Sequence, residues 1–307
     1  MPPADLLIPL REKLLDLVSG SDRARTLNQA TAPVRSRVEV PDADPMDGDP
    51  AAELRDLLHE VLSKGLGDHG GNVNYAALRA SPLYGDFRHC TEKLRAFDPS
   101  TLSDRNARLA FWINLYNTLV TDAVIALGVK RSVTEQRGGI SFFRRAAYIV
   151  GGQRMSCDDI EHGILRANRG HPLYAGRQFG SSDVRLKRVI EPFDARIHFA
   201  LNCASRSCPP IRVYSAEKVD SQLNLATRSY LAAHVRILPE QNALHLSSIF
   251  KWFQSDFGGR EGMLDFLLAH LSDDERREWL MQNRRTARLR YASYDWRLNN
   301  TLPLGKT

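Results

Sequence analysis

The sequence of 307 residues is poor in cysteine, in long apolar runs and in excess charge. Four cysteines are too few for the disulfide scaffolds that stabilise small secreted domains. The net charge is only +6, and the arginines fall in short clusters such as Arg144-Arg145 and Arg284-Arg285. Short basic clusters are typical of a solvated surface, so we expect no nucleic-acid partner.

The sequence also lacks the run of about 20 apolar residues that a membrane span needs. The longest candidate, residues 115–127, is interrupted by Asn117, Thr121 and Asp122. A short apolar run at residues 6–10 is followed at once by charged residues, unlike a secretory signal. We therefore expect no membrane span and a cytoplasmic protein whose cysteines stay reduced.

What is present is an ordinary globular composition, with 43% hydrophobic and 25% charged residues. This composition excludes a mainly disordered chain and a fibrous one. Residues 4–19 repeat apolar side chains with a helical period, whereas residues 20–49 are rich in proline and aspartate. The sequence therefore predicts an N-terminal amphipathic helix over 1–19, a linker over 20–49 and a main domain over 50–307.

The main domain begins with helical patterns, predicted over 50–64, 82–96 and 104–127. The third helix has Ser103 or Asp104 as its N-cap and Gly128 beyond its C-terminus. Short strands and helices then alternate: a hairpin over 148–155, a helix over 156–168, a strand over 196–202, a helix over 215–233, a hairpin over 235–246, helices over 248–256, 260–271 and 273–282, and a strand over 288–296. This order predicts an α+β fold, a mainly helical single domain with a small sheet of short strands.

Helix 104–127 carries polar amides inside an otherwise apolar sequence. Asn114, Asn117 and Thr121 share one stripe, and Trp112 lies on the broad apolar face. A buried amide must be hydrogen-bonded or must line a cavity. The stripe therefore either pins neighbouring loops or forms the wall of a site, in which Asn117 orients a catalytic group and Asn114 and Trp112 contact substrate.

The segment 196–210 combines a predicted strand with a loop of small residues. The strand places His198 and Asn202 on one face and ends at Cys203. Ser205 and the other small side chains permit a substrate to approach, and Arg206 favours a thiolate. A nucleophilic cysteine is one interpretation, and a small apolar side chain packed at the strand end is the other.

A third segment, residues 157–166, is a helix that Ser156 and Asp159 open as a capping box. His162 follows Glu161 and precedes Gly163, which permits another element to approach closely. This histidine is either a catalytic base or an ordinary structural residue.

The sequence patterns that would indicate metal, redox or phosphate chemistry are weaker than those for a thiol site. His162, His198, Cys203 and Cys208 lack the paired spacing of zinc knuckles, and Cys203 and Cys208 lack the Cys-x-x-Cys spacing of redox couples. The glycine pairs do not form a phosphate-binding motif. We expect no metal and no other cofactor.

Four segments in this order resemble the domain of unknown function 547 family: Ala110–Asn117, Ile160–Arg166, Ile197–Pro210 and Phe250–Phe257. The resemblance covers about residues 70–260, and residues 294–298 also fit its C-terminal pattern. The family has no assigned activity, so the resemblance implies membership rather than a reaction. Its motif often has glycine where this chain has Ala204, which reduces the freedom of the loop backbone.

The three segments together favour a thiol-dependent hydrolase or acyltransferase acting on a small molecule or a peptide. Cys203 is the predicted nucleophile, with His162 or His198 as base and Asn117 or Glu161 orienting the imidazole. The predicted substrate contacts are Asn114, Trp112, Asn202, Arg206 and Ser205. By analogy this site would sit on a papain- or transglutaminase-like fold. The alternatives are a non-catalytic protein-interaction module and a Cys/His metal or redox site.

Overall fold

A computed structural model describes residues 3–20, 26–29, 50–63, 71–102, 104–135, 139–272 and 274–301. The predicted linker, 20–49, therefore lies almost wholly outside the described residues. The α-helices are α1 (Pro3–Ser19), α2 (Pro50–Ser63), α3 (Tyr75–Ala80), α4 (Pro82–Lys93), α5 (Arg105–Ala126), α6 (Ile140–Arg145), α7 (Val219–His234), α8 (Ser248–Trp252), α9 (Gly259–His270) and α10 (Glu275–Asn283). The π-helix η4 spans Asp159–Leu165, and short 3-10 turns include η6 (Ala195–Phe199) and η8 (Gln254–Phe257).

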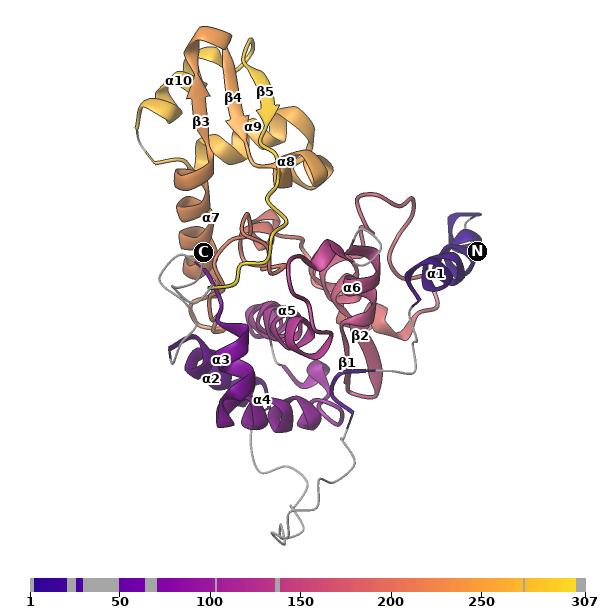
Figure 1. The fold of residues 1–307 in the computed structure, drawn as a ribbon. Helices are drawn as coiled ribbons and strands as arrows, with labels where there is room; N and C mark the ends of the chain where they lie inside the picture. Colours follow the sequence, from indigo (N-terminus) through magenta and orange to yellow (C-terminus); the bar gives the residue numbers. More distant parts are fainter. Residues whose placement is uncertain are drawn as a thin grey trace, which may run out of the picture.

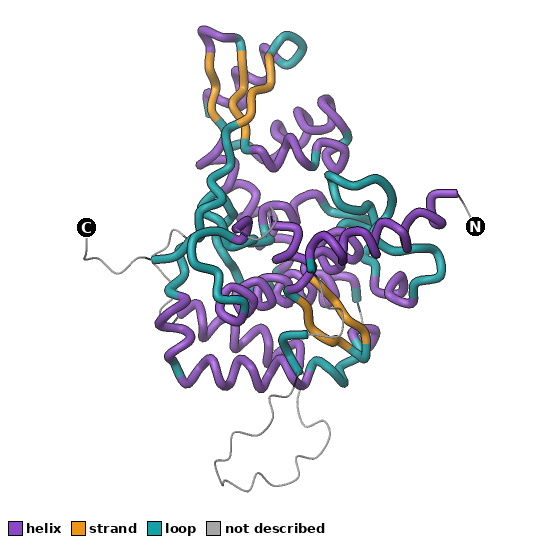
Figure 2. The backbone as a smooth tube through the Cα atoms, turned by 45° about the vertical axis from the view of Figure 1, so that its right-hand side comes forward, coloured by secondary structure: helices purple, strands orange, loops and turns teal. Residues whose placement is uncertain are grey.

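Within the described residues, five strands form two small sheets, which lie apart in the fold (Figure 2). The strands are β1 (Ala147–Val150), β2 (Gln153–Ser156), β3 (Arg236–Leu238), β4 (Ala243–Leu246) and β5 (Arg288–Tyr291). β1 and β2 are an antiparallel hairpin, while β4 pairs antiparallel with β3 and parallel with β5. The prediction of a mainly helical α+β fold with few short strands is confirmed.

Two hydrophobic cores organise these elements (Figure 1). The first surrounds α5, which contacts α2, α3, α7 and η4. The second lies between α8, α9 and the three-stranded sheet. The turn η6 joins the cores, because Ile197 belongs to the first and Phe199 to the second. A site at η6 can therefore draw side chains from both cores.

The central helix α5 forms where its capping residues predict. The Asp104 carboxylate accepts a hydrogen bond from the Ala107 N–H (2.8 Å), and Gly128 follows the helix in the left-handed region (φ 66°). α5 is the one described helix that is long and apolar enough to cross a membrane, but 94% of its apolar window is buried inside the molecule. Its apolar character is therefore explained by its place in the core.

The predicted strand over 196–202 is wrong. Residues 195–199 form the 3-10 turn η6, which begins where the Asp194 carboxylate accepts a hydrogen bond from the Arg196 N–H (3.0 Å). The apolar alternation of this segment has another cause. Ile197 and Leu201 pack into the first core and Phe199 into the second, so opposite sides of a turn are both buried.

Two further boundaries differ from the prediction. α7 begins at Val219 rather than directly after Ser215, since residues 216–218 form a turn in which the Lys218 N–H donates to the Ser215 carbonyl (3.1 Å). β5 ends at Tyr291, and the residues that follow form an extended loop. That loop carries Tyr294 towards the Cys203 segment.

The capping box before η4 is confirmed, since the Ser156 Oγ accepts from the Asp159 N–H (3.1 Å) and Asp159 accepts from the Ser156 N–H (3.0 Å). The close approach expected at Gly163 is also present. A Cβ at this position would lie 2.2 Å from the Phe179 ring, so only glycine fits.

Gly163→Ala is expected to lower the free energy of unfolding by about 1–3 kcal/mol, because the buried Phe179 ring must move. Gly85 in α4 is a matched control, since a Cβ there meets no atom within 4 Å and alanine favours a helix. Gly85→Ala is expected to raise stability by up to about 1 kcal/mol. Urea denaturation of both variants tests the contrast, and equal effects would contradict it.

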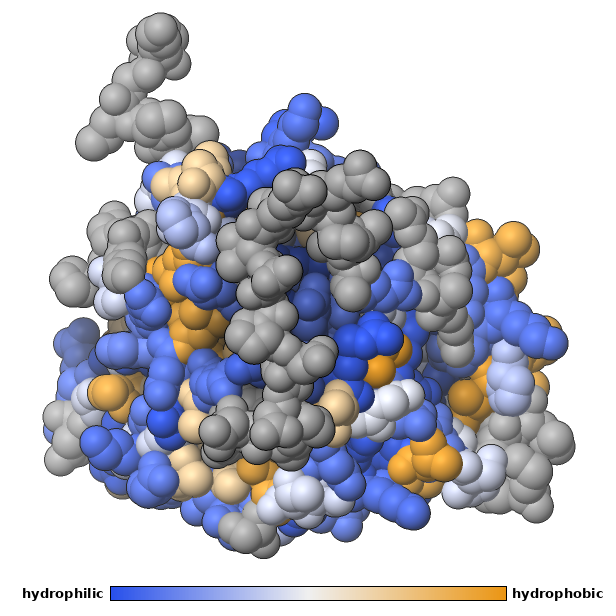
Figure 3. All heavy atoms as spheres, turned by 90° about the horizontal axis from the view of Figure 1, so that it is seen from below, coloured by the Kyte–Doolittle hydropathy of each residue, from blue (hydrophilic) through white to orange (hydrophobic). Residues whose placement is uncertain are grey.

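Outside the cores, α1 packs beside α6 (Figure 1), where the Arg144 guanidinium pairs with Glu12 (2.9 Å) and Asp16 (2.5 Å). Four leucines of the predicted apolar stripe remain exposed on α1: Leu7, Leu10, Leu14 and Leu17. On the face seen in Figure 3 hydrophilic residues predominate and hydrophobic ones are scattered.

Candidate functional site

A cavity of about 230 Å³ lies where the two cores meet. Its polar lining comes from η4 and the adjoining turn, from η6 and from the Cys203 loop: Asp158, Glu161, His162, His171, His198, Cys203 and Cys208. Its apolar lining comes mainly from α8 and the loop after β5: Ile249, Trp252, Phe253 and Trp296, with Leu173 and Leu201. The cavity therefore brings the predicted Cys203, Glu161, His162 and His198 together.

Buried amides hold the loop that carries Cys203. Asn117 Nδ2 donates to the Ala200 carbonyl (3.1 Å), and Asn117 Oδ1 accepts from the Asn202 N–H (2.9 Å). Asn202 in turn donates to the Pro209 carbonyl (2.6 Å) and accepts from the Ala204 N–H (2.8 Å). Asn117 and Asn202 therefore shape the loop through backbone bonds rather than through contact with the cavity.

The loop turns at Ala204, whose φ of 64° lies in the left-handed region that favours glycine. The next two residues pair with the C-terminal segment: Ser205 forms an antiparallel bridge with Leu298, and the Arg206 N–H donates to the Arg297 carbonyl (2.9 Å). This pairing places the Tyr294 hydroxyl 3.1 Å from Cys208 Sγ and 3.5 Å from Cys203 Sγ. The tyrosine therefore contacts both thiols.

The two thiols form one hydrogen-bonded group. Cys208 Sγ accepts from the Cys203 backbone N–H (3.0 Å) and from Ser205 Oγ (3.3 Å). Burial alone would raise the pKa of the Cys208 thiol, but hydrogen bonds from Cys203, Ser205 and Tyr294 outweigh burial and lower that pKa to about 6.

The pKa of the Cys203 thiol is shifted in the opposite direction. Its hydrogen bond to Cys208, together with burial, raises its pKa well above the ordinary value. These opposite shifts favour loss of the Cys208 proton before that of Cys203. Within the described ranges, neither sulfur makes a hydrogen bond to a histidine nitrogen.

His198 is one of a buried group with Asp256 and Arg166. Its Nε2 lies 2.9 Å from Asp256 Oδ2, while Arg166 binds both oxygens of the same carboxylate (2.6 and 3.0 Å). Burial raises the pKa of Asp256, but these hydrogen bonds outweigh it and hold the pKa at about 2. Because the carboxylate can only accept, His198 carries its proton on Nε2 and its Nδ1 is a free acceptor.

His162 has the opposite arrangement of hydrogen bonds. Its Nδ1 lies 3.0 Å from an Arg166 nitrogen, and a guanidinium can only donate. Burial and the charge of Arg166 lower the pKa of His162 well below its ordinary value. His162 is therefore neutral, with its proton on Nε2, and it acts as a hydrogen-bond donor.

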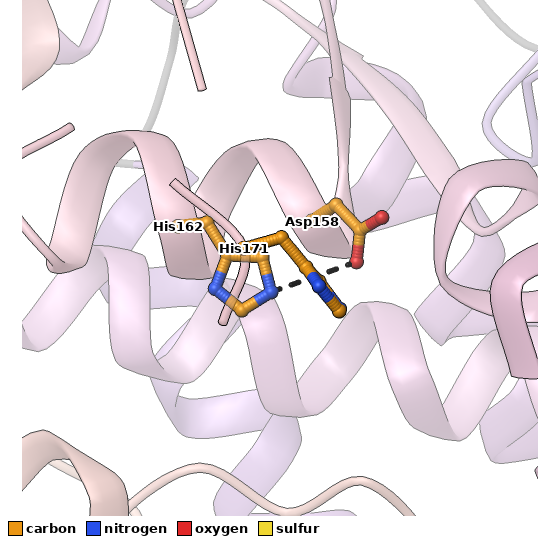
Figure 4. A group of neighbouring side chains, drawn as sticks. All are labelled: Asp158, His162 and His171. Carbon is orange, nitrogen blue, oxygen red and sulfur yellow. Dashed lines mark ion pairs between the residues drawn. The ribbon is translucent and has the colours of Figure 1, made fainter. Parts of the chain in front are cut away.

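Two half-buried carboxyl groups, those of Glu161 and Asp158, adjoin this histidine. Tyr116 donates to Glu161 (3.0 Å), and burial raises the pKa of Glu161 to about 7. Asp158 Oδ1 lies 3.9 Å from His162 Nε2, and burial raises the pKa of Asp158 to about 8. Figure 4 shows Asp158 and His162 on one helical segment with His171 beside them.

Asp158, His162 and His171 place one potential ligand atom each within 4.8 Å of one another, which resembles a metal centre. Their protons do not fit that role. His162 Nε2 carries hydrogen, and His171 Nδ1 accepts from the Leu173 N–H (3.1 Å), which leaves the proton of its neutral ring on Nε2. A ligating histidine instead donates through its second nitrogen.

None of the five predicted substrate contacts is among the residues that line the cavity. Trp112 is buried against Phe111 in the first core. Asn114 is bonded to the backbone of Tyr214 through both its donor and its acceptor, and the Arg206 side chain is exposed. Ser205 contacts both thiols and is part of the site.

The site residues not predicted are Asp158, His171, Asp256 and Tyr294, together with the lowered pKa of Cys208. Asp256 and Tyr294 lie in segments that carry the family resemblance, 250–257 and 294–298, which was a signal available in the sequence. His171 is a single histidine in a loop and has no comparable signal.

The fold and this cavity define a mainly helical α+β domain with a site of two half-buried thiols. Residues 99–231 match the family model described as "Protein of unknown function, DUF547", which confirms the predicted resemblance over these residues. The match includes both cysteines of the cavity, Cys203 and Cys208, together with His162 and His198, and it ends before Asp256. No curated protein and no solved structure matches the chain. The papain- or transglutaminase-like analogy stays a prediction.

Proposed function

We propose that the protein is a thiol-dependent hydrolase or acyltransferase whose nucleophile is the Cys208 thiolate. The observation that carries the proposal is the cluster of polar groups around Cys208 Sγ at the cavity: the Cys203 N–H (3.0 Å), Ser205 Oγ (3.3 Å) and the Tyr294 hydroxyl (3.1 Å). Sequence patterns favour Cys203 as nucleophile, but its neighbour accepts more hydrogen bonds and is the better thiolate.

Of the two predicted bases, His198 fits the role. Asp256 fixes the proton on Nε2, leaves Nδ1 as the acceptor and would stabilise an imidazolium. His162 does not fit, because Arg166 occupies its Nδ1 and the other nitrogen carries hydrogen. Hydrogen bonds between nucleophile and base are often long before substrate binds.

The chemistry is acyl transfer. The Cys208 thiolate adds to a carbonyl carbon, a C–S bond forms, and the carbonyl π electrons move to oxygen. Collapse breaks the bond to the leaving group, which receives the Cys203 proton by way of His198. Water or another nucleophile then cleaves the thioester, Cys208 leaves as thiolate, and the nucleophile's proton restores the Cys203 thiol.

The mostly apolar lining of the cavity supports an acyl group with an apolar body as substrate. The proposal includes a cytoplasmic location, because the mechanism needs both thiols reduced.

We expect p-nitrophenyl acetate to release a burst of about one nitrophenolate per chain, with one acetyl group retained on Cys208. Stopped-flow absorbance measures the burst, and tryptic mass spectrometry locates the acetyl group. Cys208→Ser is expected to reduce the acylation rate by at least about 1000-fold. Cys90, a buried thiol of α4 outside the cavity, gives the matched control Cys90→Ser, which should acylate normally. Equal bursts from both variants would overturn the proposal.

A dithiol redox function is the second candidate, because Cys203 and Cys208 lie together, with the Cys203 backbone N–H donating to Cys208 Sγ (3.0 Å). Here the Cys208 thiolate would attack a disulfide oxidant, break its S–S bond and release one thiolate. Cys203 would then lose its proton and displace the second thiolate, so that a Cys203–Cys208 disulfide forms and two electrons pass to the oxidant. Oxidised glutathione tests this: rapid, reversible loss of two hydrogens without any ester burst favours redox chemistry over acyl transfer.

A further inference from the structure

Asp158, His162 and His171 form a second polar group in the cavity, beside the thiols. We propose that these three side chains hold one hydroxyl oxygen of the acyl acceptor, a water molecule or an alcohol, which cleaves the thioester on Cys208. This inference rests on the proposed function and assigns the acceptor of its second step.

The spacing fits one oxygen atom. One nitrogen or oxygen atom from each side chain lies within 4.8 Å of the other two. An oxygen placed at the centre of these three atoms would lie no farther than about 2.8 Å from each, within hydrogen-bond range. The 3.9 Å between His162 Nε2 and Asp158 Oδ1 is too long for a direct hydrogen bond. In the described part of the chain, neither atom has another hydrogen-bond partner, although the two side chains are only 5% and 12% exposed.

The hydrogen-bonding roles identify the chemical class. His162 Nε2 donates, because Arg166 occupies Nδ1, whereas Asp158 accepts in its ionised form, the form that can act as a base. An oxygen between them must accept one hydrogen bond and donate another. A hydroxyl group does both, whereas an ammonium group cannot accept, a carbonyl oxygen cannot donate, and a metal ion needs the lone pair that His162 lacks.

The same contacts supply a chemical role. The Asp158 carboxylate takes the hydroxyl proton as the oxygen attacks, a C–O bond forms at the carbonyl carbon, and the C–S bond breaks. Cys208 leaves with the electron pair, and the proton passes from Asp158 through solvent to the Cys203 sulfur. Burial holds the pKa of Asp158 at about 8, which suits a base that works near neutral pH.

The experiment separates acylation from deacylation with p-nitrophenyl acetate as the probe. Asp158→Asn is expected to keep the nitrophenolate burst, which shows that the variant is folded, and to slow loss of the acetyl group by at least about 100-fold. Intact-mass spectrometry would then show the acetyl-protein accumulating. In the unsubstituted protein the deacetylation rate is expected to rise with pH through about 8, and this rise is lost in the variant.

Asp86→Asn, an exposed substitution on α4, is the matched control and should deacetylate normally. Absence of a burst from the unsubstituted protein overturns the proposed function and this assignment together. A normal burst with unchanged deacetylation in Asp158→Asn overturns the assignment alone. Stoichiometric Zn²⁺ uptake that His162→Ala abolishes would also overturn it, because the group would then bind a cation.

Discussion

Iodoacetamide is expected to alkylate Cys208 at a rate that rises with pH through a midpoint near 6, whereas an ordinary cysteine responds near pH 8.5. Only the thiolate reacts, and a group with this pKa is about nine-tenths ionised at pH 7. Burial raises the pKa of Cys90 to about 11. We therefore expect Cys208 to react at least about 1000-fold faster than Cys90 at pH 7.

Peptide mapping resolves the two cavity thiols, because trypsin cleaves after Arg206 and separates Cys203 from Cys208. Tyr294→Phe removes one of the hydroxyl donors to the sulfur and is expected to move the midpoint upward by about one pH unit. Alkylation mainly of Cys203, or a midpoint near 8.5 that Tyr294→Phe leaves unchanged, would contradict the thiolate assignment.

Local patterns in the sequence predicted the elements that depend on local interactions. The Asp104 cap, the Ser156–Asp159 capping box and the hairpins β1–β2 and β3–β4 each involve residues close in the chain. The glycine at position 163 likewise indicated the close contact that Phe179 makes. These features form because neighbouring groups satisfy one another's backbone hydrogen bonds or leave space.

The strand predicted over 196–202 failed for a tertiary reason. Alternating burial is typical of a strand with one core beneath it, but Ile197 and Phe199 are buried in two different cores. Apolar alternation does not distinguish these cases, because it reports which residues are buried and not what covers them.

The candidate site was likewise predictable from the sequence only in part. Cys203, His162, His198 and Glu161 were predicted and lie at one cavity, but their hydrogen-bonding roles depend on residues distant in sequence. Asp256 binds Nε2 of His198 and so leaves Nδ1 of that ring as the acceptor. Arg166 instead binds Nδ1 of His162, so this ring has no acceptor nitrogen left for a substrate. The buried amide stripe similarly left two interpretations open, and the bonds of Asn117 to the 200–202 backbone favour pinning of the loop.

Asp256→Asn is expected to lower the free energy of unfolding by about 3–5 kcal/mol at pH 7, because it leaves the buried Arg166 charge without a partner. Arg166 and Asp256 are 3% and 1% exposed, and their closest N–O distance is 2.6 Å. The surface pair of Arg284 with Asp265 (2.6 Å) is the control, and Asp265→Asn is expected to cost less than about 1 kcal/mol.

The pH dependence of this difference gives a second check. The pKa of Asp256 is held at about 2, below its ordinary value, so the ionised form stabilises the fold above about pH 4 and that stability is lost as pH falls towards 2. The difference in free energy of unfolding between the unsubstituted protein and Asp256→Asn should therefore become smaller as the pH falls over this range. Urea denaturation from pH 7 to 2.5 measures it. A loss below about 1 kcal/mol at pH 7, or a gap independent of pH, would show that Asp256 does not hold Arg166 and His198 as a charged group.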